Sequence, residues 1–168
     1  MLLREDALDI LKISGCSKKV IAHCVAVADL ALSMGLKLEN DGLDVDLELV
    51  EIGGLLHDLG RAKSHGIDHA IVGVDIAKEN HIEPMVQEII KRHIGAGITR
   101  EEAKKVGLPD DDYIPVTLEQ KIVAHADNLL IGTERISLDR RIRKMQEKNI
   151  DEGSIERVKA LAEEIGIC

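Results

Sequence analysis

The sequence predicts an all-α protein formed by a single domain. Apolar residues recur at helical spacing through most of the 168 residues, and no Val, Ile or Thr alternation is long enough to predict a strand. Hydrophobic residues make up 45% of the chain, but Tyr113 is the only aromatic one, so the core must be aliphatic. A chain of this length can bury a substantial core within one domain.

Capping residues and glycines mark the expected ends of the first helices. One helix is expected from Ser17 to Met34, with Gly35 as its C-terminal stop. A second is expected to begin after a cap at Asp46 and to run towards His57. Periodic apolar residues therefore place two helices in the first third of the chain.

Four further helix starts follow the same rules. A helix is expected over 68–79, and Pro84 can occupy the first turn of another that runs to about residue 92. Thr99 and Thr117 each have Glu or Gln three residues later, which is the pattern of a capping box. The GLPDDDYIP segment between these two starts is predicted as a solvated loop, with a mobile lid that stacks Tyr113 on a base as the alternative.

The last segment is highly charged and predicts two amphipathic helices. The apolar face of the second is formed by Ile155, Val158, Leu161, Ala162 and Ile165. The basic cluster of this segment is interleaved with acidic residues and is interpreted as a solvated helix face; it consists of Arg140, Arg141, Arg143 and Lys144.

Net charge and cysteine content limit the classes of partner. A formal charge of −9 and the absence of Phe and Trp argue against nucleic acid as a partner, because such binding uses basic surfaces and aromatic stacking. Three cysteines without CxxC spacing indicate a reducing compartment. The opening MLLREDALDILK is too charged for a signal or membrane segment, so a cytoplasmic protein without a membrane contact is expected.

Two polar residues lie on helix faces that are otherwise apolar. His23 shares a face with Val27, where a single histidine is usually an ordinary core residue. Asp127 shares a face with Leu130 and has no basic residue four positions before or after it. A buried carboxylate must be paired, protonated or bound to a cation, so either a distant partner such as an arginine or a cation is expected at Asp127.

Three histidines and an aspartate stand at expected helix ends. His57 and Asp58 follow an apolar run and a Gly-Gly pair that lets another helix approach closely. His69 opens a helix and His93 closes one, and each alone is more often a polar helix-end residue than a ligand. Imidazole combined with carboxylate suits Fe, Mn, Zn, Ni or Co better than Ca or Mg.

Through the order of these histidines and aspartates along the sequence, the chain resembles the HD superfamily of metal-dependent phosphohydrolases. The pattern H…HD…D is matched by His23, His57-Asp58 and Asp127, and the two histidines of its extended form by His69 and His93. The run HDLGR is similar to the HDIG variant, and the resemblance covers about residues 17–135. The stretches HAIVGVDIAKE, IIKRHIGAG and LEQKIVAHADNLL look most like the small bacterial HD proteins that hydrolyse diadenosine tetraphosphate symmetrically.

The resemblance implies a helical HD-domain bundle over 1–168, with residues of about 137–168 as a charged C-terminal extension. It implies one or two divalent transition metals (Fe, Mn, Ni, Co or Zn), the first held by His23, His57, Asp58 and Asp127. Asp58 would bridge to a second metal completed by His69 and His93. A metal-bound hydroxide would then hydrolyse a phosphate ester or anhydride of a nucleotide or dinucleoside polyphosphate.

Fixed positive charge near the metals is expected to hold the substrate phosphate. Arg61 stands where HDxGK proteins carry lysine, and it is expected to act in catalysis beside Asp58 because a guanidinium can grip two oxygens. Further candidates for phosphate contact are Lys63, Arg92 and Arg135. His65 is interpreted as a loop residue rather than a general acid, and His125 as facing away from Asp127 on their shared helix.

Three other readings remain open at the level of sequence. A binding module could hold metal and nucleotide without turnover and serve regulation. A diiron oxygenase of the same superfamily would use the same ligand types. A structural helical adaptor would leave His23 and Asp127 unexplained. A homodimer built by the charged C-terminal helices is also left open.

Overall fold

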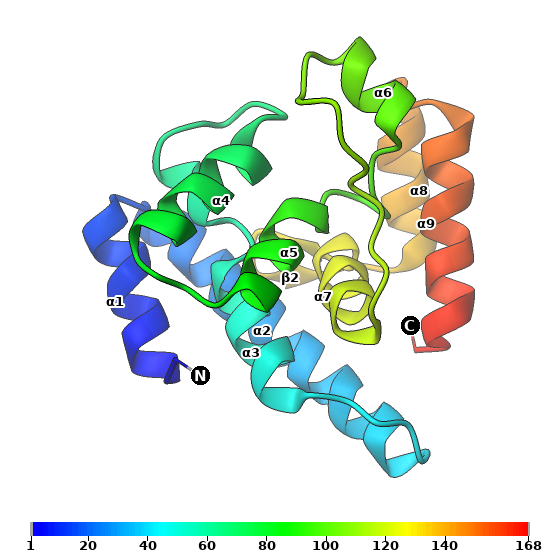
Figure 1. Cartoon of the computed structure of the whole chain (residues 1–168). Coiled ribbons are helices and arrows are strands. Elements are labelled where there is room, and N and C mark those ends of the chain that lie inside the picture. The colour runs from blue at the N-terminus through cyan, green and yellow to red at the C-terminus, as the bar shows by residue number, and fades with distance from the viewer. Residues whose placement is uncertain (1, 168) are drawn as a thin grey trace.

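Helices dominate residues 2–167, the part of the chain that the computed structural model describes (Figure 1). In chain order they are α1 (Arg4–Ser14), α2 (Lys18–Asn40), α3 (Leu47–Leu56), α4 (His69–Glu79), α5 (Pro84–Arg92), α6 (Arg100–Lys105), α7 (Leu118–Asn128), α8 (Leu138–Glu147) and α9 (Glu152–Ile165). A 3-10 helix, η1 (Leu59–Ala62), follows α3, and β1 (Leu130–Ile131) pairs antiparallel with β2 (Glu134–Arg135). The all-α prediction is confirmed; the small hairpin was not expected, because two-residue strands are too short to show alternation.

The predicted helix starts are confirmed where a local cap defines them. The Asp46 side chain accepts a hydrogen bond from the Leu49 amide, and Pro84 is the first residue of α5. Thr99 and Thr117 both form complete capping boxes with the residue three positions later. These caps satisfy amides that a helix leaves without a partner in its first turn.

The prediction that Gly35 ends its helix is wrong, because α2 continues to Asn40. Gly35 is buried within the helix, and a Cβ atom there would lie 2.9 Å from Cδ2 of Leu47. The glycine therefore allows the start of α3 to approach α2. A sequence does not distinguish this use of glycine from a C-terminal stop.

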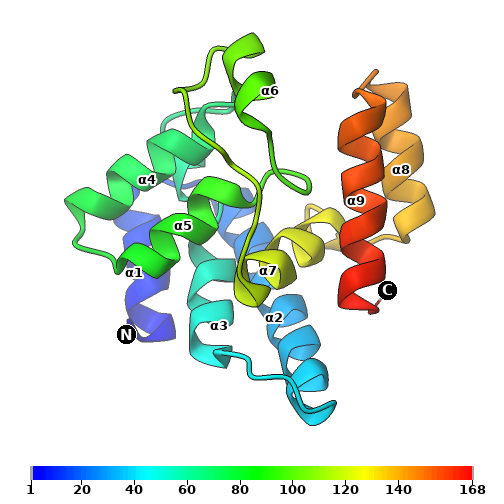
Figure 2. The same ribbon diagram turned by 45° about the vertical axis from the view of Figure 1, so that its right-hand side comes forward.

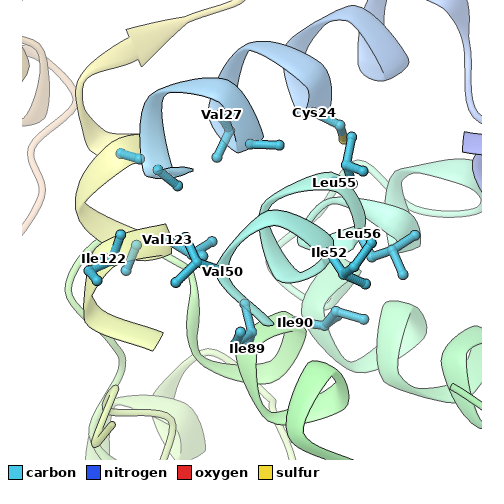
Figure 3. Packing of buried hydrophobic residues seen from close by; sticks show 14 of the residues in the cluster. Cys24, Val27, Val50, Ile52, Leu55, Leu56, Ile89, Ile90, Ile122 and Val123 are labelled. Atoms are coloured by element: carbon cyan, nitrogen blue, oxygen red, sulfur yellow. The ribbon is translucent and has the colours of Figure 1, made fainter. Parts of the chain in front are cut away.

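Helix α3 lies at the centre of the hydrophobic core. Its apolar residues face α2 on one side and α5 and α7 on the other (Figure 3). A Cβ atom at Gly54 would lie 2.7 Å from Cα of Ala28, and one at Gly53 would collide with the end of the Ile89 side chain. The predicted close helix approach at this Gly-Gly pair is confirmed.

Helix α2 is the one described helix with the length and composition of a bilayer span. Here it packs on α3 and α7, with Cys24, Val27 and Ala31 fully buried. In this fold α2 is a core helix of a small domain, which is consistent with a soluble protein. The cytoplasmic location remains a prediction.

The charged C-terminal segment forms two neighbouring helices at one end of the molecule (Figure 2). The predicted apolar face of α9 is confirmed, since all five of its residues are buried, and α9 packs against α7. Helix α8 packs on α9 and contains no fully buried residue. Helix α7 thus lies between this pair and the other helices.

The loop between α6 and α7 holds the only aromatic residue. Tyr113 is 2% exposed and packs with Ala103 and Leu108 in a small second cluster. Its hydroxyl donates a hydrogen bond to the carbonyl of Pro109. The alternative of a lid that stacks Tyr113 on a base is therefore not supported by this conformation, in which the ring belongs to the core.

Candidate metal centre

Six histidine and aspartate side chains from five parts of the chain meet at one point. His23 comes from the middle of α2, His57 and Asp58 from the end of α3, and Asp127 from α7. His69 is the first residue of α4, and His93 directly follows α5. The structure thus brings together all six residues that the sequence singled out as metal ligands.

The first half of the cluster surrounds the carboxylate of Asp127. Its Oδ1 lies 3.0 Å from Nε2 of His23 and 3.7 Å from Nε2 of His57. Oδ2 of Asp58 lies 3.8 Å from each of the same two nitrogens. Two imidazoles and two carboxylates therefore face one small volume.

The second half shares Asp58 with the first. The other oxygen of Asp58, Oδ1, lies 3.2 Å from Nε2 of His69 and 3.4 Å from Nε2 of His93. The two histidine nitrogens are 3.0 Å apart. Because its two oxygens face different pairs of histidines, the Asp58 carboxylate lies between the two halves.

Each of the four histidines is held through Nδ1 by a backbone carbonyl. These carbonyls belong, in chain order, to Gly132, Gly54, Gly66 and Ile90, at distances of 2.7, 2.7, 2.8 and 2.7 Å. A carbonyl can only accept, so Nδ1 must carry the proton in every case. Nε2 of each ring then faces the cluster, where it can offer its lone pair to a metal once the ring is neutral, as in histidines that bind a metal.

These donors fit a bound cation. Nε2 of His57 is buried and has no hydrogen-bond partner among the described residues. Three trios of ligand atoms each lie within 4.8 Å of one another, namely His23-His57-Asp58, His57-His93-Asp127 and Asp58-His69-His93. Nitrogen and carboxylate donors together match divalent transition metals, and a cation would relieve the crowding of lone pairs.

The electrostatics of the cluster also favour a cation. Burial raises the pKa of Asp58 and of Asp127, but the surrounding histidines outweigh it and hold both carboxyl groups well below their usual range. Burial lowers the pKa of His57, and the two carboxylates more than offset this and raise it to about 9. For His93 burial dominates, and its pKa is lowered. Both carboxylates are therefore ionised.

A cavity of about 770 Å³ opens over the cluster and is lined by Arg61 and by five of its six residues. Arg61 Nε lies 3.3 Å from Oδ1 of Asp58, and its Nη1 donates to the carbonyl of His65. His57 is fully buried behind this lining. Arg61 is thus the predicted phosphate contact that lies beside the metal centre.

The other predicted phosphate contacts lie elsewhere in the described structure. Lys63 is exposed and 3.9 Å from Glu79, and Arg135 is exposed on β2. Arg92 is bound to Glu88 and to the carbonyl of Ile114. Two of the remaining histidines lie as predicted: His65 is exposed in a loop, and His125 turns away to bond the carbonyl of Ile167.

Sequence reasoning missed the role of Arg141. Its guanidinium donates to the carbonyls of Asp127, Asn128 and Leu130, just where α7 ends. It therefore stabilises the end of the helix that carries Asp127. Among residues 2–167 no arginine pairs with the Asp127 carboxylate itself, so the alternative of an arginine partner is not supported. Its position in a charged, interleaved segment made it look like a surface residue, and no spacing signal separates it from Arg140.

Fold and cluster together define a helical domain with a candidate His/Asp metal centre. The family model for the HD domain matches residues 20–131, and the chain belongs to this family. The family membership supports the coarse function predicted above, that of an HD-domain phosphohydrolase.

Individual relatives differ in length and in name. An uncharacterized protein of Methanocaldococcus jannaschii is 49% identical over 162 residues, which are 96% of this chain and 95% of that protein. A tRNA (cytidine(56)-2'-O)-methyltransferase of Picrophilus torridus is 43% identical over 165 residues, but this chain spans only 47% of its length. The HD domain of the L. monocytogenes phosphodiesterase PgpH, in complex with cyclic-di-AMP, shares the fold, with a TM-score of 0.56 at 17% identity over 93% of this chain and 92% of that one.

Proposed function

We propose that this protein is a metal-dependent phosphohydrolase that cleaves a phosphodiester or phosphoanhydride bond of a nucleotide. The observation that carries the proposal is the shared carboxylate of Asp58. Its two oxygens face two separate pairs of histidines, whose Nε2 atoms have no other protein partner than the members of the cluster. A carboxylate in this position can serve two cations at once.

His23, His57, Asp58 and Asp127 would hold one metal, and Asp58, His69 and His93 a second. Iron, manganese, nickel, cobalt and zinc all suit these donors. A bound divalent metal would supply Lewis-acid stabilisation of phosphoryl charge and would lower the pKa of bound water. No Ser or Cys nucleophile is then required, and the buried Cys24, whose thiol pKa burial raises well above its usual value, has no part in it.

Arg61 is the side chain that would bind the reacting phosphate. Two of its N–H groups hold Asp58 and the carbonyl of His65, and the remaining ones make no hydrogen bond to a described residue. A guanidinium anchored in this way can present a fixed positive charge to phosphate oxygens. It would also orient Asp58, so Arg61 links phosphate binding to the metal centre.

A nucleotide is proposed as substrate from the cavity and the relatives. A volume of about 770 Å³ suits a small-molecule ligand, and apolar side chains such as Ile94, Ile98 and Leu130 line it beside the polar cluster. The PgpH domain of the same fold is a phosphodiesterase with cyclic-di-AMP bound. The Picrophilus relative carries its matching segment in a protein named for an activity on tRNA. Ribonucleotide phosphodiesters are therefore the first class to test, with dinucleoside polyphosphates as the competing class.

The test combines metal analysis with an anaerobic assay. Wild type and the variants Asp58→Ala and His65→Ala are purified, their metal content is measured, and each is assayed on phosphomonoesters, dinucleotides, cyclic dinucleotides and dinucleoside polyphosphates. Turnover without oxygen by wild type and His65→Ala, lost in Asp58→Ala, is the expected result. Bound metal with no turnover on any substrate would favour a regulatory binding module, and turnover that requires oxygen would favour a diiron oxygenase.

A further inference from the structure

Three lysines line the same cavity as the His/Asp cluster but come from other parts of the chain. Lys105 ends α6, Lys144 lies in the last turn of α8, and Lys148 directly follows α8. None of them belongs to the HD motif, and the family model ends at residue 131, before α8 begins. The C-terminal helices therefore contribute basic residues to the same cavity as the metal centre.

These lysines have no partner in the described structure, residues 2–167. Some lysines elsewhere, such as Lys63, Lys104 and Lys121, form ion pairs, and others do not. No ion pair or hydrogen bond to a described residue is formed by the side chains of Lys105, Lys144 and Lys148. What sets these three apart is that they line one cavity together with the candidate metal centre.

Two acidic residues outside the cluster, Glu102 and Asp151, line the same cavity, and both already have hydrogen-bond partners. Glu102 accepts hydrogen bonds from the Arg157 guanidinium at 2.6 Å and from the Thr99 amide at 2.8 Å. Asp151 caps α9 through the amide and hydroxyl of Ser154. Glu102 is paired with a cation and Asp151 keeps one negative charge, so the three lysines leave this group of side chains with a net positive charge.

The helices that carry these lysines are also held in place. Arg157 on α9 donates to Glu102 on α6 and to the carbonyl of Gly97 at 3.3 Å, which ties the two elements together. Helix α8 packs on α9 in turn. Apolar side chains also line the cavity, among them Ile98, Val106, Met145 and Val158. The cavity thus combines the candidate metal centre, apolar side chains and three lysines.

We propose that Lys105, Lys144 and Lys148 bind a second phosphate group of the substrate while the metal centre holds the first. The proposal rests on the function proposed above and specifies its substrate: a ribonucleotide that carries a phosphate beyond the one hydrolysed, such as a 5'-phosphorylated dinucleotide. Its base and ribose would lie against the apolar part of the cavity. Lysine is suited to this role because its ammonium can donate to several phosphate oxygens without a fixed geometry.

Binding of two matched dinucleotides tests the proposal. The probes are pApA and ApA with a phosphorothioate linkage that slows hydrolysis, so that they differ only in the terminal phosphate. Wild type is expected to bind pApA about 10-fold more tightly than ApA, the effect of about one charge-assisted hydrogen bond. The triple variant Lys105→Gln/Lys144→Gln/Lys148→Gln is expected to bind both with nearly equal dissociation constants.

Arg143→Gln is the matched control, because Arg143 is exposed on the same helix and lies outside the lining of this cavity. It should retain the wild-type preference for pApA. Equal binding of both probes by wild type, or an equal loss in Arg143→Gln and in the lysine variant, would overturn the proposal. Thermal melting of each variant shows that it is folded.

A separate assay distinguishes failure of this inference from failure of the proposed function. Bis(p-nitrophenyl) phosphate has one phosphorus atom and no second phosphate, so its metal-dependent hydrolysis by wild type reports the metal centre alone. Hydrolysis without a preference for pApA would reject the lysine site only. A preference for pApA without any hydrolysis would keep the lysine site and reject the phosphohydrolase.

Discussion

Nε2 of His69 lies 3.0 Å from Nε2 of His93, and Nδ1 of each ring is bound to a backbone carbonyl. Two neutral rings held in this way direct lone pairs at each other. The carboxylate of Asp58, 3.2 and 3.4 Å away, adds further negative charge at the same point. A cation placed among these three groups would remove the repulsion.

The shared position of Asp58 predicts an asymmetric effect of ligand removal. Wild type should bind about two metal ions per chain, as two-metal phosphohydrolases do. His69→Ala should retain about one, because the ligands around Asp127 are untouched, whereas Asp58→Ala should lose nearly all. Metal content by mass spectrometry checks this, with the exposed His65→Ala as the control. Equal metal content in Asp58→Ala and His69→Ala would show that Asp58 is not shared.

Arg141 is expected to stabilise the end of α7. Its partly buried guanidinium donates to three carbonyls, so Arg141→Gln should leave acceptors unsatisfied and lower the free energy of unfolding by about 2 kcal/mol. Arg140→Gln loses only an exposed contact with Glu134 and should cost at most about 0.5 kcal/mol. Urea unfolding measures both. A similar small loss for both variants would mean that water replaces Arg141 at these carbonyls.

The two adjacent glycines of α3 should differ in their tolerance of a methyl group. At Gly54 an added Cβ meets the backbone of Ala28, which cannot move without shifting α2, so Gly54→Ala should destabilise the protein by about 2 to 3 kcal/mol. At Gly53 it meets the end of the Ile89 side chain, which can adopt another rotamer, so Gly53→Ala should cost less. Melting temperatures of the two variants give the comparison, and the reverse order would contradict it.

The ion pair between Glu102 on α6 and Arg157 on α9 predicts that the free energy of unfolding depends on pH. Burial raises the pKa of Glu102, but the Thr99 amide and the Arg157 guanidinium outweigh it and lower the pKa below its ordinary value. The folded state therefore holds this proton less tightly than the unfolded chain, so the stabilisation is full above about pH 5 and is lost as the pH falls through the folded pKa.

Comparison with Glu102→Gln isolates this contribution, because glutamine can still complete the capping box. Wild type should exceed the variant by about 1 kcal/mol in free energy of unfolding at neutral pH, and the difference should shrink below about pH 4. A difference that stays constant down to about pH 3 would show that the carboxylate charge is not what stabilises this link.

Local features of the chain were predictable because their partners lie a few residues away. The capping boxes at Thr99 and Thr117 each close over three residues, so the sequence contains both halves of the interaction. The apolar face of α9 repeats with the helical period and was predicted residue by residue. The order of histidines and aspartates, together with the resemblance to the HD superfamily, led to the family that the comparisons support.

The environments of three residues could not be predicted from the local sequence, namely those of Gly35, Arg141 and Lys144. Whether a glycine stops a helix or admits a neighbour depends on what lies across from it, and Leu47 is brought there only by folding. Arg141 and Lys144 share one charged helix with Arg143, and their different environments depend on how α8 packs beside α7 and α9.

The sequence by itself determined the helical class, the local helix ends and the identity of six candidate ligands. Only the tertiary structure decided that these ligands meet, that Arg61 but not Lys63 lies beside them, and that the C-terminal helices add lysines to the cavity. The physical reason is range: His23 and Asp127 are 104 positions apart and 3.0 Å from each other. Such contacts arise from the packing of whole helices, which no local pattern of residues specifies.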